Sequence, residues 1–398
     1  MQKRFYWIFF FLLFLFVEIV TGANKGVSVN QLGLRISPKG ECIISSEIDL
    51  KGNTFVVPVG TTLYFQKKGK INNGTIYGNN TRIEWHNNSI FNKICIAGTW
   101  IVPEIYTGMF RDCEALNCVK NVFALSNSGI QNKIHIGKGR YHVSVSESGK
   151  SCIKVCANTD VILDGHIILE ANSFPVYNVF KLTGDNIYIH GTGSIAGDRD
   201  KHLGIKGEWG HGINVGNGNN IRIEGITIKD FWGDCIYVRG NNNVFISKCK
   251  IRNGRRQGIS VTQCRNVVIR NCTFEKVGGT PPGYAIDIEP NKGDLVETVL
   301  IEGNNVARCV GGIRVTGPKS SPVLNAKVRD CVVSKTVRNP YAFYNTQHLE
   351  IDNCIGKECS RPMKFVKVKE LVMGENKMVG LLSPFQMSGC YNIKRIKR

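Results

Sequence analysis

Five short segments between residues 212 and 315 repeat one pattern, and this repeat constrains the fold more than any other feature of the sequence. Each has a small residue, an Ile, a variable residue and a second β-branched residue; the segments are Gly212–Val215, Cys235–Val238, Gly258–Val261, Ala285–Ile288 and Gly312–Val315. Their first residues lie 23, 23, 27 and 27 positions apart. A period in the twenties is typical of a solenoid, and the alternation within each segment is typical of a strand. The sequence therefore predicts an all-β fold, a single-stranded right-handed parallel β-helix in which each repeat forms one coil.

A second repeat follows these strands and supports the same register. An aliphatic residue and an Ile stand two positions apart in residues 243–249, 266–272 and 348–354, and a turn residue comes three positions after the last Ile. This turn position holds only Cys and Asn: Cys249, Cys272, Asn304, Cys331, Cys354 and Asn376. An Asn at such a position can hydrogen-bond the backbone of a buried turn. We therefore expect these side chains to stack inside the β-helix from coil to coil.

Three regions follow one another along the chain. Lys3 and Arg4 precede an apolar run that ends near residue 20, and small residues follow it, so residues 1–23 are predicted to be a secretory signal peptide. Residues 24–125 are predicted to form an N-terminal cap and the first coils, with a short helix within 113–126, because the open end of a β-helix must be covered. Residues 126–398 are predicted to continue the β-helix to a basic C-terminal tail.

The predicted signal peptide and the charge of the chain indicate where the protein acts and on what. Export predicts a secreted or periplasmic protein, with no Cys near the cleavage site for a lipid anchor and no further membrane span; an uncleaved anchor is the alternative. The formal net charge is +20 at pH 7, which favours an anionic partner. Nucleic acid, anionic lipid and acidic polysaccharide all fit this charge, and export makes nucleic acid the weakest of the three. An acidic polysaccharide is the expected partner. No zinc site is predicted, because the sequence has no Cys-x-x-Cys and its His residues are scattered.

Polar residues of five successive coils are predicted to gather on one face. Side chains alternate along a strand, so the residues between the inward-facing Ile and Val positions must face outward. These residues, those that precede each strand and those of the connecting loops give the candidates His211, Asp234, Tyr237, Arg239, Gln257, Tyr284, Asp287, Glu289, Arg314, Trp209, Trp232, Arg255 and Arg256. Coils lie about 4.8 Å apart, so five coils span roughly 20 Å, which suits several sugars of a polysaccharide.

Four phrases of this face resemble the motif series of the polygalacturonase family of glycoside hydrolases, in the same order on successive coils. They are His211-Gly212-Ile213, Gly233-Asp234-Cys235-Ile236, Gln257-Gly258-Ile259-Ser260 and Gly312-Ile313-Arg314-Val315. Asp234 and Arg314 match motif residues of that family, whereas the other motif positions hold different residues. The broader resemblance is to the pectate-lyase-like right-handed parallel β-helix superfamily. The resemblance implies a parallel β-helix fold and an activity on a polysaccharide.

Two reactions are consistent with this face. Glycoside hydrolysis needs two carboxylates, which lie ~6.5–9.5 Å apart in inverting enzymes. Asp234 and Asp287 belong to strands two coils apart and fit this spacing. β-Elimination from a uronic acid instead needs a positive charge on the substrate carboxylate and a base that takes the α-proton. The charge can come from Arg255, Arg256 or Arg314, and the base can be His211, Tyr237 or Tyr284.

The candidate residues divide into two groups by role. We expect the catalytic residues to be Asp234, Asp287, Glu289, His211 and Arg314. Guanidinium groups bind acids and sugars stack on aromatic faces, so we expect the substrate-binding residues to be Arg255, Arg256, Gln257, Tyr237, Tyr284, Trp209, Trp232 and Arg239. No cofactor is predicted, although Asp234, Asp287 and Glu289 offer oxygen ligands of the kind that Ca²⁺ prefers. The alternative to an enzyme is a non-catalytic glycan-binding or adhesive surface.

Overall fold

The computed structural model describes residues 26–318 and 322–396, which form two compact units. The first unit comprises residues 26–102 and 108–112, and the second comprises residues 103–107 and the described residues from 113 onward. The predicted signal peptide lies outside the described residues. Within those residues, no helix combines the length and the apolar character that a membrane span requires.

Strand β6 (Lys70–Glu84) is the centre of the first unit, because four strands pair with it in parallel. The elements of this unit are β1 (Gly26–Val27), η1 (Asn30–Leu32), β2 (Glu41–Ile44), β3 (Glu47–Asp49), β4 (Thr54–Val56), β5 (Thr62–Phe65), β6, β7 (Phe91–Ile101) and β9 (Phe110–Arg111). Phe55, Phe65 and Ile76 are fully buried. The first unit therefore has an apolar core of its own.

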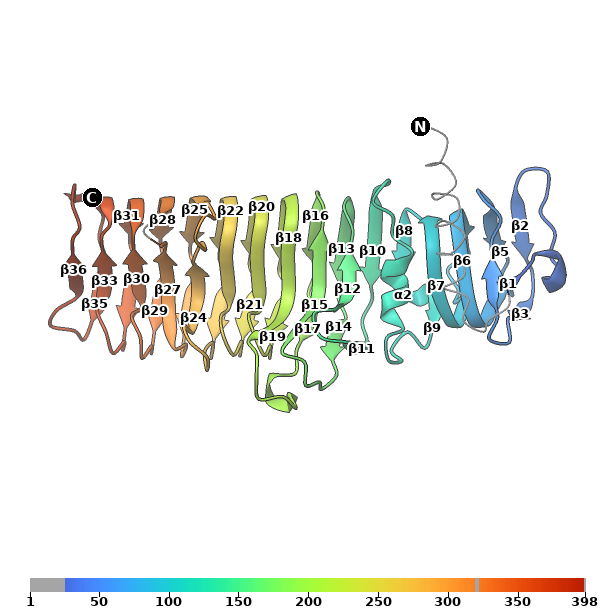
Figure 1. Ribbon diagram of the computed structural model, residues 1–398, viewed down its shortest axis with the longest axis horizontal. Helices are drawn as coiled ribbons and strands as arrows, with labels where there is room; N and C mark the ends of the chain where they lie inside the picture. The colour runs from blue at the N-terminus through green and yellow to red at the C-terminus, as the bar shows by residue number, and fades with distance from the viewer. Residues whose placement is uncertain (1–25, 319–321, 397–398) are drawn as a thin grey trace, which may run out of the picture. The chain divides into compact units, whose positions relative to one another are not determined.

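The strands of the second unit form three parallel sheets (Figure 1). Sheet 1 consists of β12 (Ser151–Val155), β15 (Val176–Thr183), the first halves of β18 (Trp209–Glu224), β20 (Ile236–Ser247) and β22 (Ile259–Arg270), and then β24 (Tyr284–Ile288), β27 (Gly311–Thr316), β30 (Tyr341–Tyr344), β33 (Met363–Val366) and β36 (Phe385–Ser388). Sheet 2 consists of β8 (Glu104–Tyr106), β10 (Asn132–Ile136), β13 (Thr159–Leu163), β16 (Ile187–His190), the second halves of β18, β20 and β22, and then β25 (Val296–Glu302), β28 (Val323–Arg329), β31 (Thr346–Asp352), β34 (Lys369–Met373) and β37 (Lys394–Arg395).

Sheet 3 completes each coil, since the chain visits sheets 3, 1 and 2 in turn. Its strands are β11 (Arg140–Val143), β14 (His166–Leu169), β17 (Ser194–Ala196), β19 (Thr227–Lys229), β21 (Lys250–Arg252), β23 (Thr273–Glu275), β26 (Asn305–Ala307), β29 (Val332–Ser334), β32 (Ile355–Lys357) and β35 (Lys377–Val379). The helix expected within residues 113–126 is α2 (Val119–Ala124). Two short 3-10 helices also occur, η2 (Thr107–Met109) and η3 (Arg199–Lys201).

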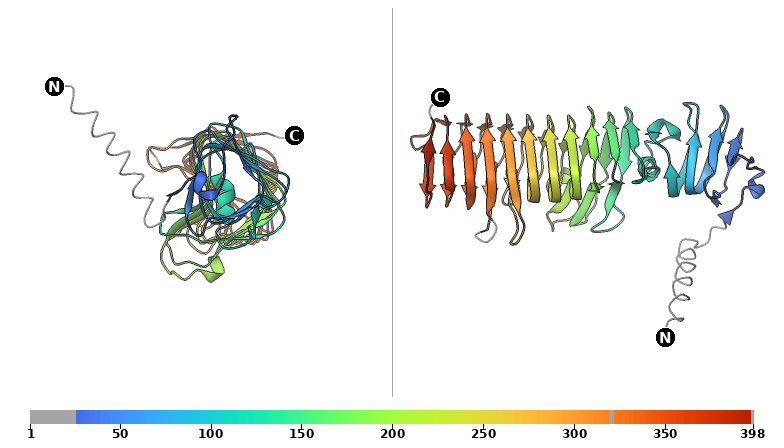
Figure 2. Two further views of the ribbon diagram at one scale, coloured as in Figure 1. Left: turned by 90° about the vertical axis from the view of Figure 1, so that its right-hand side faces the viewer. Right: turned by 90° about the horizontal axis from the view of Figure 1, so that it is seen from above.

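Inward-facing side chains fill the coils of the second unit as the alternation predicts. The Ile and Val residues of the five repeated segments have no exposed surface: Ile213, Val215, Ile236, Val238, Ile259, Val261, Ile286, Ile288, Ile313 and Val315. Burial of each such side chain contributes about 1.5–3 kcal/mol, so their stacked rows hold the coils together. Figure 2 shows the strands of this unit side by side along the stack. The predicted parallel β-helix is confirmed.

The turn position that holds Cys and Asn is confirmed as a column that is buried from Cys249 to Cys354, with Asn376 half-buried at its end. Asn304 Nδ2 donates a hydrogen bond to the Ile269 carbonyl at 2.8 Å, and Asn304 Oδ1 accepts one from the backbone N–H of Cys272 at 2.9 Å. Asn376 makes the equivalent pair of bonds. The Cys249 thiol instead donates to a backbone carbonyl of the preceding coil. All cysteines in the described part of the chain are free thiols.

Replacement of Asn304 by Ala should lower the free energy of unfolding by about 1–3 kcal/mol, because two buried backbone groups lose their partner. The measurement is the urea midpoint of the purified chain. Asn305→Ala is the matched control, since the neighbouring Asn305 is exposed and should change stability by less than about 0.5 kcal/mol. Equal midpoints for the two variants would contradict the structural role of the column.

One connection of the second unit projects beyond the turns of the neighbouring coils. It is the segment between β17 and β18, residues 197–208, which contains η3 (Figure 1). Its first residues are fixed to the next coil, because Gly197 N donates to the Lys229 carbonyl at 2.8 Å and Arg199 N donates to the Asp230 carbonyl at 2.7 Å. We call this segment the 197–208 loop, and it leads directly into the first strand of the candidate site.

Candidate functional site

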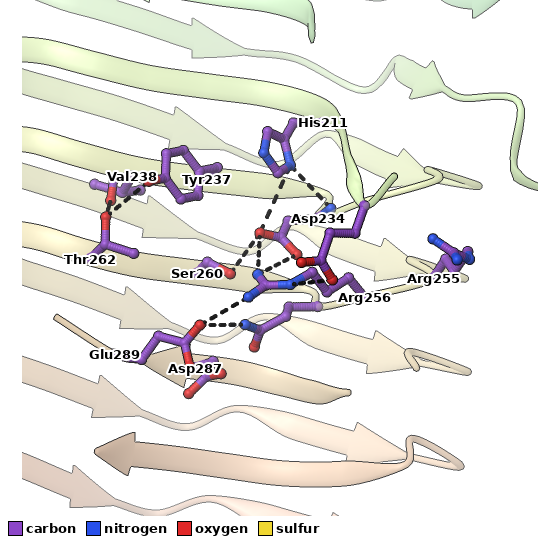
Figure 3. Close-up of polar contacts among 12 residues, drawn as sticks. His211, Asp234, Tyr237, Val238, Arg255, Arg256, Ser260, Thr262, Asp287 and Glu289 are labelled. Atoms are coloured by element: carbon purple, nitrogen blue, oxygen red, sulfur yellow. Dashed lines mark hydrogen bonds and ion pairs between the residues drawn. The ribbon is translucent and has the colours of Figure 1, made fainter. Parts of the chain in front are cut away.

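The structure gathers the predicted residues into two adjacent rows along sheet 1. The residues directly before the small residue of each repeated segment form the first row, which runs through His211, Asp234, Gln257 and Tyr284. Residues in register across β18, β20, β22, β24 and β27 form the second row, which runs through Asn214, Tyr237, Ser260, Asp287 and Arg314. The two rows thus bring predicted residues from five coils side by side. Figure 3 shows several of them directed toward one another.

These rows do not form the open face that strand alternation predicts. The residues with no exposed surface are Asp234, Gln257, Ser260 and Asp287. The prediction that the outward-facing residues lie in solvent is therefore wrong for the centre of the rows. The long side chains of Arg256, which precedes β22, and Arg314, which lies in β27, pair with the carboxylates. A carboxylate that leaves water needs such a partner, and each of the two buried ones has an arginine.

One arginine and one serine hold the buried carboxylate of Asp234. Arg256 Nη1 donates to the two carboxylate oxygens at 3.3 and 3.1 Å, and Ser260 Oγ donates to one of them at 2.8 Å (Figure 3). Burial raises the pKa of Asp234 to about 6, although Arg256 and Ser260 favour the charged form. Asp234 therefore anchors Arg256 and titrates near neutral pH.

The raised pKa of Asp234 gives a testable dependence of stability on pH. The pKa of Asp234 in the folded chain, about 6, exceeds the ordinary value of 3.8. The titration of Asp234 therefore stabilises the fold fully below pH 3.8, and this stabilisation is lost as the pH rises to about 6. The loss amounts to about 3 kcal/mol. The measurement is urea unfolding of Asp234→Asn and of the parent chain at several pH values. The free energy of unfolding of the variant minus that of the parent should rise by this amount between acid and neutral pH. A constant difference would refute the assignment.

Arg314 holds the second buried carboxylate, that of Asp287. Its Nε and Nη2 donate to the two oxygens of Asp287 at 2.7 and 2.6 Å, and Nη2 also contacts Glu289. Burial raises the pKa of Asp287, and Arg314 opposes this shift. The guanidinium also lies 5.2 Å from the ring centroid of Tyr284. Arg314 thus neutralises a buried carboxylate and positions a second, partly exposed one.

Arg256 joins the two carboxylates of the cluster that reach solvent. Its Nη2 lies 3.0 Å from Glu289 Oε1, and its Nε lies 3.6 Å from Glu208 Oε2. The Glu289 and Glu208 side chains are 25% and 35% exposed, whereas Asp234 and Asp287 are not exposed at all. Both contacts are made to one planar guanidinium, so the two oxygens lie within about 9 Å of each other. Sequence reasoning did not select Glu208, although it stands in the loop directly before the first strand.

The imidazole of His211 is buried and neutral. Its Nδ1 accepts a hydrogen bond from the backbone N–H of Asp234 at 3.2 Å, which places the ring proton on Nε2. Burial and the charge of Arg256 lower the pKa of His211 to about 3. The ring stacks on Tyr237 with centroids 5.0 Å apart, and Tyr237 Oη lies 3.1 Å from Thr262 Oγ1. This geometry does not favour His211 as the base expected for elimination, since its basic nitrogen is occupied.

Two of the predicted substrate-binding residues form a stack beside the cluster. The Arg255 guanidinium lies 3.7 Å from the ring centroid of Trp232, and the imidazole of His202 stacks on the same indole at 4.1 Å. Arg255 Nη1 also donates to the Gly207 carbonyl at 2.9 Å. Because Gly207 precedes Glu208, this stack holds the end of the 197–208 loop against the cluster.

The remaining predicted residues lie at different depths. Gln257 Nε2 donates to Glu289 Oε1 at 3.4 Å, so Gln257 belongs to the buried part of the cluster. Trp209 is half exposed at the start of β18. Arg239 reaches Asp294 at 3.4 Å instead of the cluster, so the structure does not bring it to the carboxylates.

The three carboxylates proposed for Ca²⁺ do not fit a cation. Asp234, Asp287 and Glu289 all direct oxygens at the guanidinium groups of Arg256 and Arg314, whose charges repel a divalent ion. No group of three or more His, Cys, Asp or Glu residues suited to a metal ion occurs in residues 26–318 and 322–396. The cluster is an array of carboxylates paired with guanidinium groups.

A family model described as a right handed beta helix region matches residues 167–327. The second unit is a right-handed parallel β-helix. The right-handed parallel β-helix expected from the sequence is thereby confirmed as the fold. No curated protein matches the sequence of this β-helix protein.

Several solved structures are similar to the β-helix at low sequence identity. The family 28 exopolygalacturonase of Yersinia enterocolitica is 10% identical, with 93% of this chain and 78% of that chain covered and a TM-score of 0.43. The exopolygalacturonase of Thermotoga maritima is 13% identical, with 73% and 91% covered and a TM-score of 0.47. The A-module of a mannuronan C-5 epimerase of Azotobacter vinelandii is 9% identical, with 70% and 94% covered and a TM-score of 0.48. These likenesses concern the fold, whereas activity must be argued from the site.

Proposed function

We propose that this β-helix protein is an exported carbohydrate-active enzyme that hydrolyses an acidic polysaccharide. The observation that carries the proposal is a pair of partly exposed carboxylates beside one guanidinium. Glu289 accepts a hydrogen bond from Arg256, and Glu208 lies at ion-pair distance from the same group. Glycoside hydrolysis uses two carboxylates, one to protonate the leaving oxygen and one to activate water or attack the sugar. A separation below about 9 Å is compatible with both versions of that reaction.

In this proposal the buried members of the cluster position the exposed ones. The buried carboxylate of Asp234 pairs with Arg256, and the buried carboxylate of Asp287 pairs with Arg314. Both arginines contact Glu289, so its carboxylate is held from two sides. Such preorganisation positions a reacting group before the substrate binds. Fixed charges then stabilise the transition state without having to rearrange during the reaction. Asp234 and Asp287 therefore change from the expected catalytic pair to positioning residues.

The flanks of the second row support an acidic substrate. Lys154 pairs in register with Lys181, which lies beside Asn214 at one end of the cluster. Lys364 pairs with Ala342, which follows Arg314 at the other end. Basic side chains thus occur on both sides of the cluster along one line of coils. A polysaccharide that lies along this line would place its acid groups near them.

Elimination has less support than hydrolysis. The basic nitrogen of His211 is engaged by a backbone N–H, and the Tyr237 hydroxyl lies within hydrogen-bond distance of Thr262. Two of the three guanidiniums that would neutralise a substrate carboxylate, those of Arg256 and Arg314, already neutralise carboxylates of the protein. A non-catalytic binding surface is the second candidate function, because every carboxylate of the cluster has an arginine partner, as in a structural ion-pair ladder.

The proposal is tested by incubating the purified protein with a panel of acidic and neutral polysaccharides. Reducing ends and the ultraviolet absorbance of unsaturated uronates are followed together. Release of reducing ends without new absorbance, from an acidic polysaccharide only, is the expected result. New absorbance would replace hydrolysis with elimination. Retention of the protein on an acidic polysaccharide without any cleavage would replace the enzyme with the binding surface.

A further inference from the structure

A pocket of about 390 Å³ lies away from the cluster, between the outer face of sheet 3 and the 197–208 loop. Sheet 3 and the 197–208 loop each form one wall of the pocket. The sheet contributes Arg140, His166, Ser194 and Lys229, and the loop contributes Asp200 and Lys201. None of the residues that line it belongs to the two rows of the cluster. The size is within the range of small-ligand sites.

The loop wall of this pocket is held in place by a buried carboxylate. Asp198, which lines the pocket, is 1% exposed and accepts hydrogen bonds from Asn172 Nδ2 at 2.8 Å, from His202 Nδ1 at 2.8 Å and from the Tyr177 hydroxyl. These donors belong to the loop and to the preceding coil. The pocket is thus preformed, which lowers the entropy cost of binding a ligand.

Several polar groups of the pocket have no side-chain partner among the described residues. Neither the Arg140 guanidinium nor the Lys201 ammonium pairs with an acid, and Asp200 uses only Oδ2, which accepts from Asn253 at 3.2 Å. His166 Nδ1 lies 2.9 Å from Ser194 Oγ, which leaves Nε2 for another contact. The pocket therefore offers both donors and acceptors to a ligand.

The charges and the apolar part of the lining define the class of ligand. The bases Arg140, Lys201 and Lys229 are balanced by the acids Asp198, Asp200 and Asp230. A pocket without net charge has no preference for an anion. Hydroxyl groups both donate and accept hydrogen bonds, as this lining requires. Ile168 and Ala196 add an apolar patch on which the carbon atoms of a ring can pack.

We propose that this pocket is a second carbohydrate site, which binds an uncharged sugar residue independently of the carboxylate cluster. It goes beyond the proposed hydrolysis of an acidic polysaccharide and does not depend on it. Because the pocket carries no net charge, its binding should change little with salt, whereas binding of an acidic glycan at the cluster should weaken as salt is added.

The test is saturation-transfer NMR of the full chain with glucose, galactose, mannose and N-acetylglucosamine, and with glucuronate as the acidic probe. We expect at least one uncharged sugar to receive saturation from the protein. Ser194→Val, which removes a hydroxyl and adds bulk, and Arg140→Gln should each weaken this binding at least about fivefold. Thr273→Val is the matched control, because Thr273 lies in the same outward row of sheet 3, three coils further on, and it should bind as the parent does.

Glu289→Gln separates this site from the cluster, since it should leave the binding of the uncharged sugar unchanged. Absence of a signal from every uncharged sugar would overturn the proposal, as would a signal that persists in both pocket variants once circular dichroism shows them folded. A signal confined to glucuronate, or lost in Glu289→Gln, would place the sugar at the cluster and would also overturn it. These outcomes can be interpreted even if the protein cleaves no polysaccharide, because the NMR experiment measures binding and not cleavage.

Discussion

Replacement of Glu289 by Gln should reduce turnover of the cleaved polysaccharide by about 10²–10⁴-fold, the range lost when a general acid or base is removed. Glu289 is partly exposed and is held by Arg256 and Arg314, so its carboxylate is the one that both arginines present to solvent. The isosteric amide keeps the size of the side chain. Binding of the polysaccharide, measured by retention on affinity gels, should change by only a few fold.

Glu302→Gln is the matched control for this variant. Glu302 is 24% exposed and pairs with Arg329 on sheet 2, so it resembles Glu289 in exposure and in having an arginine partner but lies away from the cluster. Turnover by Glu302→Gln should equal that of the parent chain. If Glu289→Gln retained full turnover as well, the cluster would be structural and the reacting carboxylates would lie elsewhere.

Replacement of Arg314 by Met should lower the free energy of unfolding by about 3–5 kcal/mol, because it leaves the fully buried carboxylate of Asp287 without its partner. The measurement is urea unfolding at neutral pH. The variant should regain stability as the pH falls, since protonation removes the uncompensated charge of Asp287. The double variant Asp287→Leu, Arg314→Met should be more stable than Arg314→Met alone.

An exposed pair provides the comparison for this effect. Arg329→Met removes the partner of Glu302, and the Arg329 side chain is 44% exposed. An exposed ion pair contributes roughly 0–1 kcal/mol, so Arg329→Met should be much less destabilised than Arg314→Met. Similar losses in the two variants would show that Asp287 is hydrated in the folded chain, contrary to the structure.

The fold could be predicted from the sequence because every coil must place apolar side chains inward, where they stack on those of the next coil. Residues such as Ile236 and Ile259 must point inward and stack on their equivalents, so their identity and spacing recur along the chain. The turn column at Asn304 is recognisable as well, since a buried turn must satisfy its backbone. Alternation by itself also aligns Tyr237, Ser260 and Asp287 in one row.

The exposure of that row does not follow from alternation. A strand pattern states which side of a sheet a side chain occupies, but it does not say what covers that side. Arg256, which stands before the strand of Ser260, turns back over Asp234, and this depends on how one turn packs. Glu208 enters through the long 197–208 loop, whose path is set by the hydrogen bonds of Asp198 rather than by the repeat. Functional positions supplied by loops carry no periodic signal.

Mass spectrometry of the fragments from a defined acidic oligosaccharide distinguishes hydrolysis from elimination and from binding alone. Hydrolysis adds one water, so the masses of the two fragments should together exceed that of the substrate by one water molecule. We expect such fragments from the parent chain and from Glu302→Gln, and almost none from Glu289→Gln. Fragments whose masses sum to that of the substrate, one with an unsaturated end, would contradict hydrolysis. An oligosaccharide that stays intact while it binds would contradict the enzyme altogether.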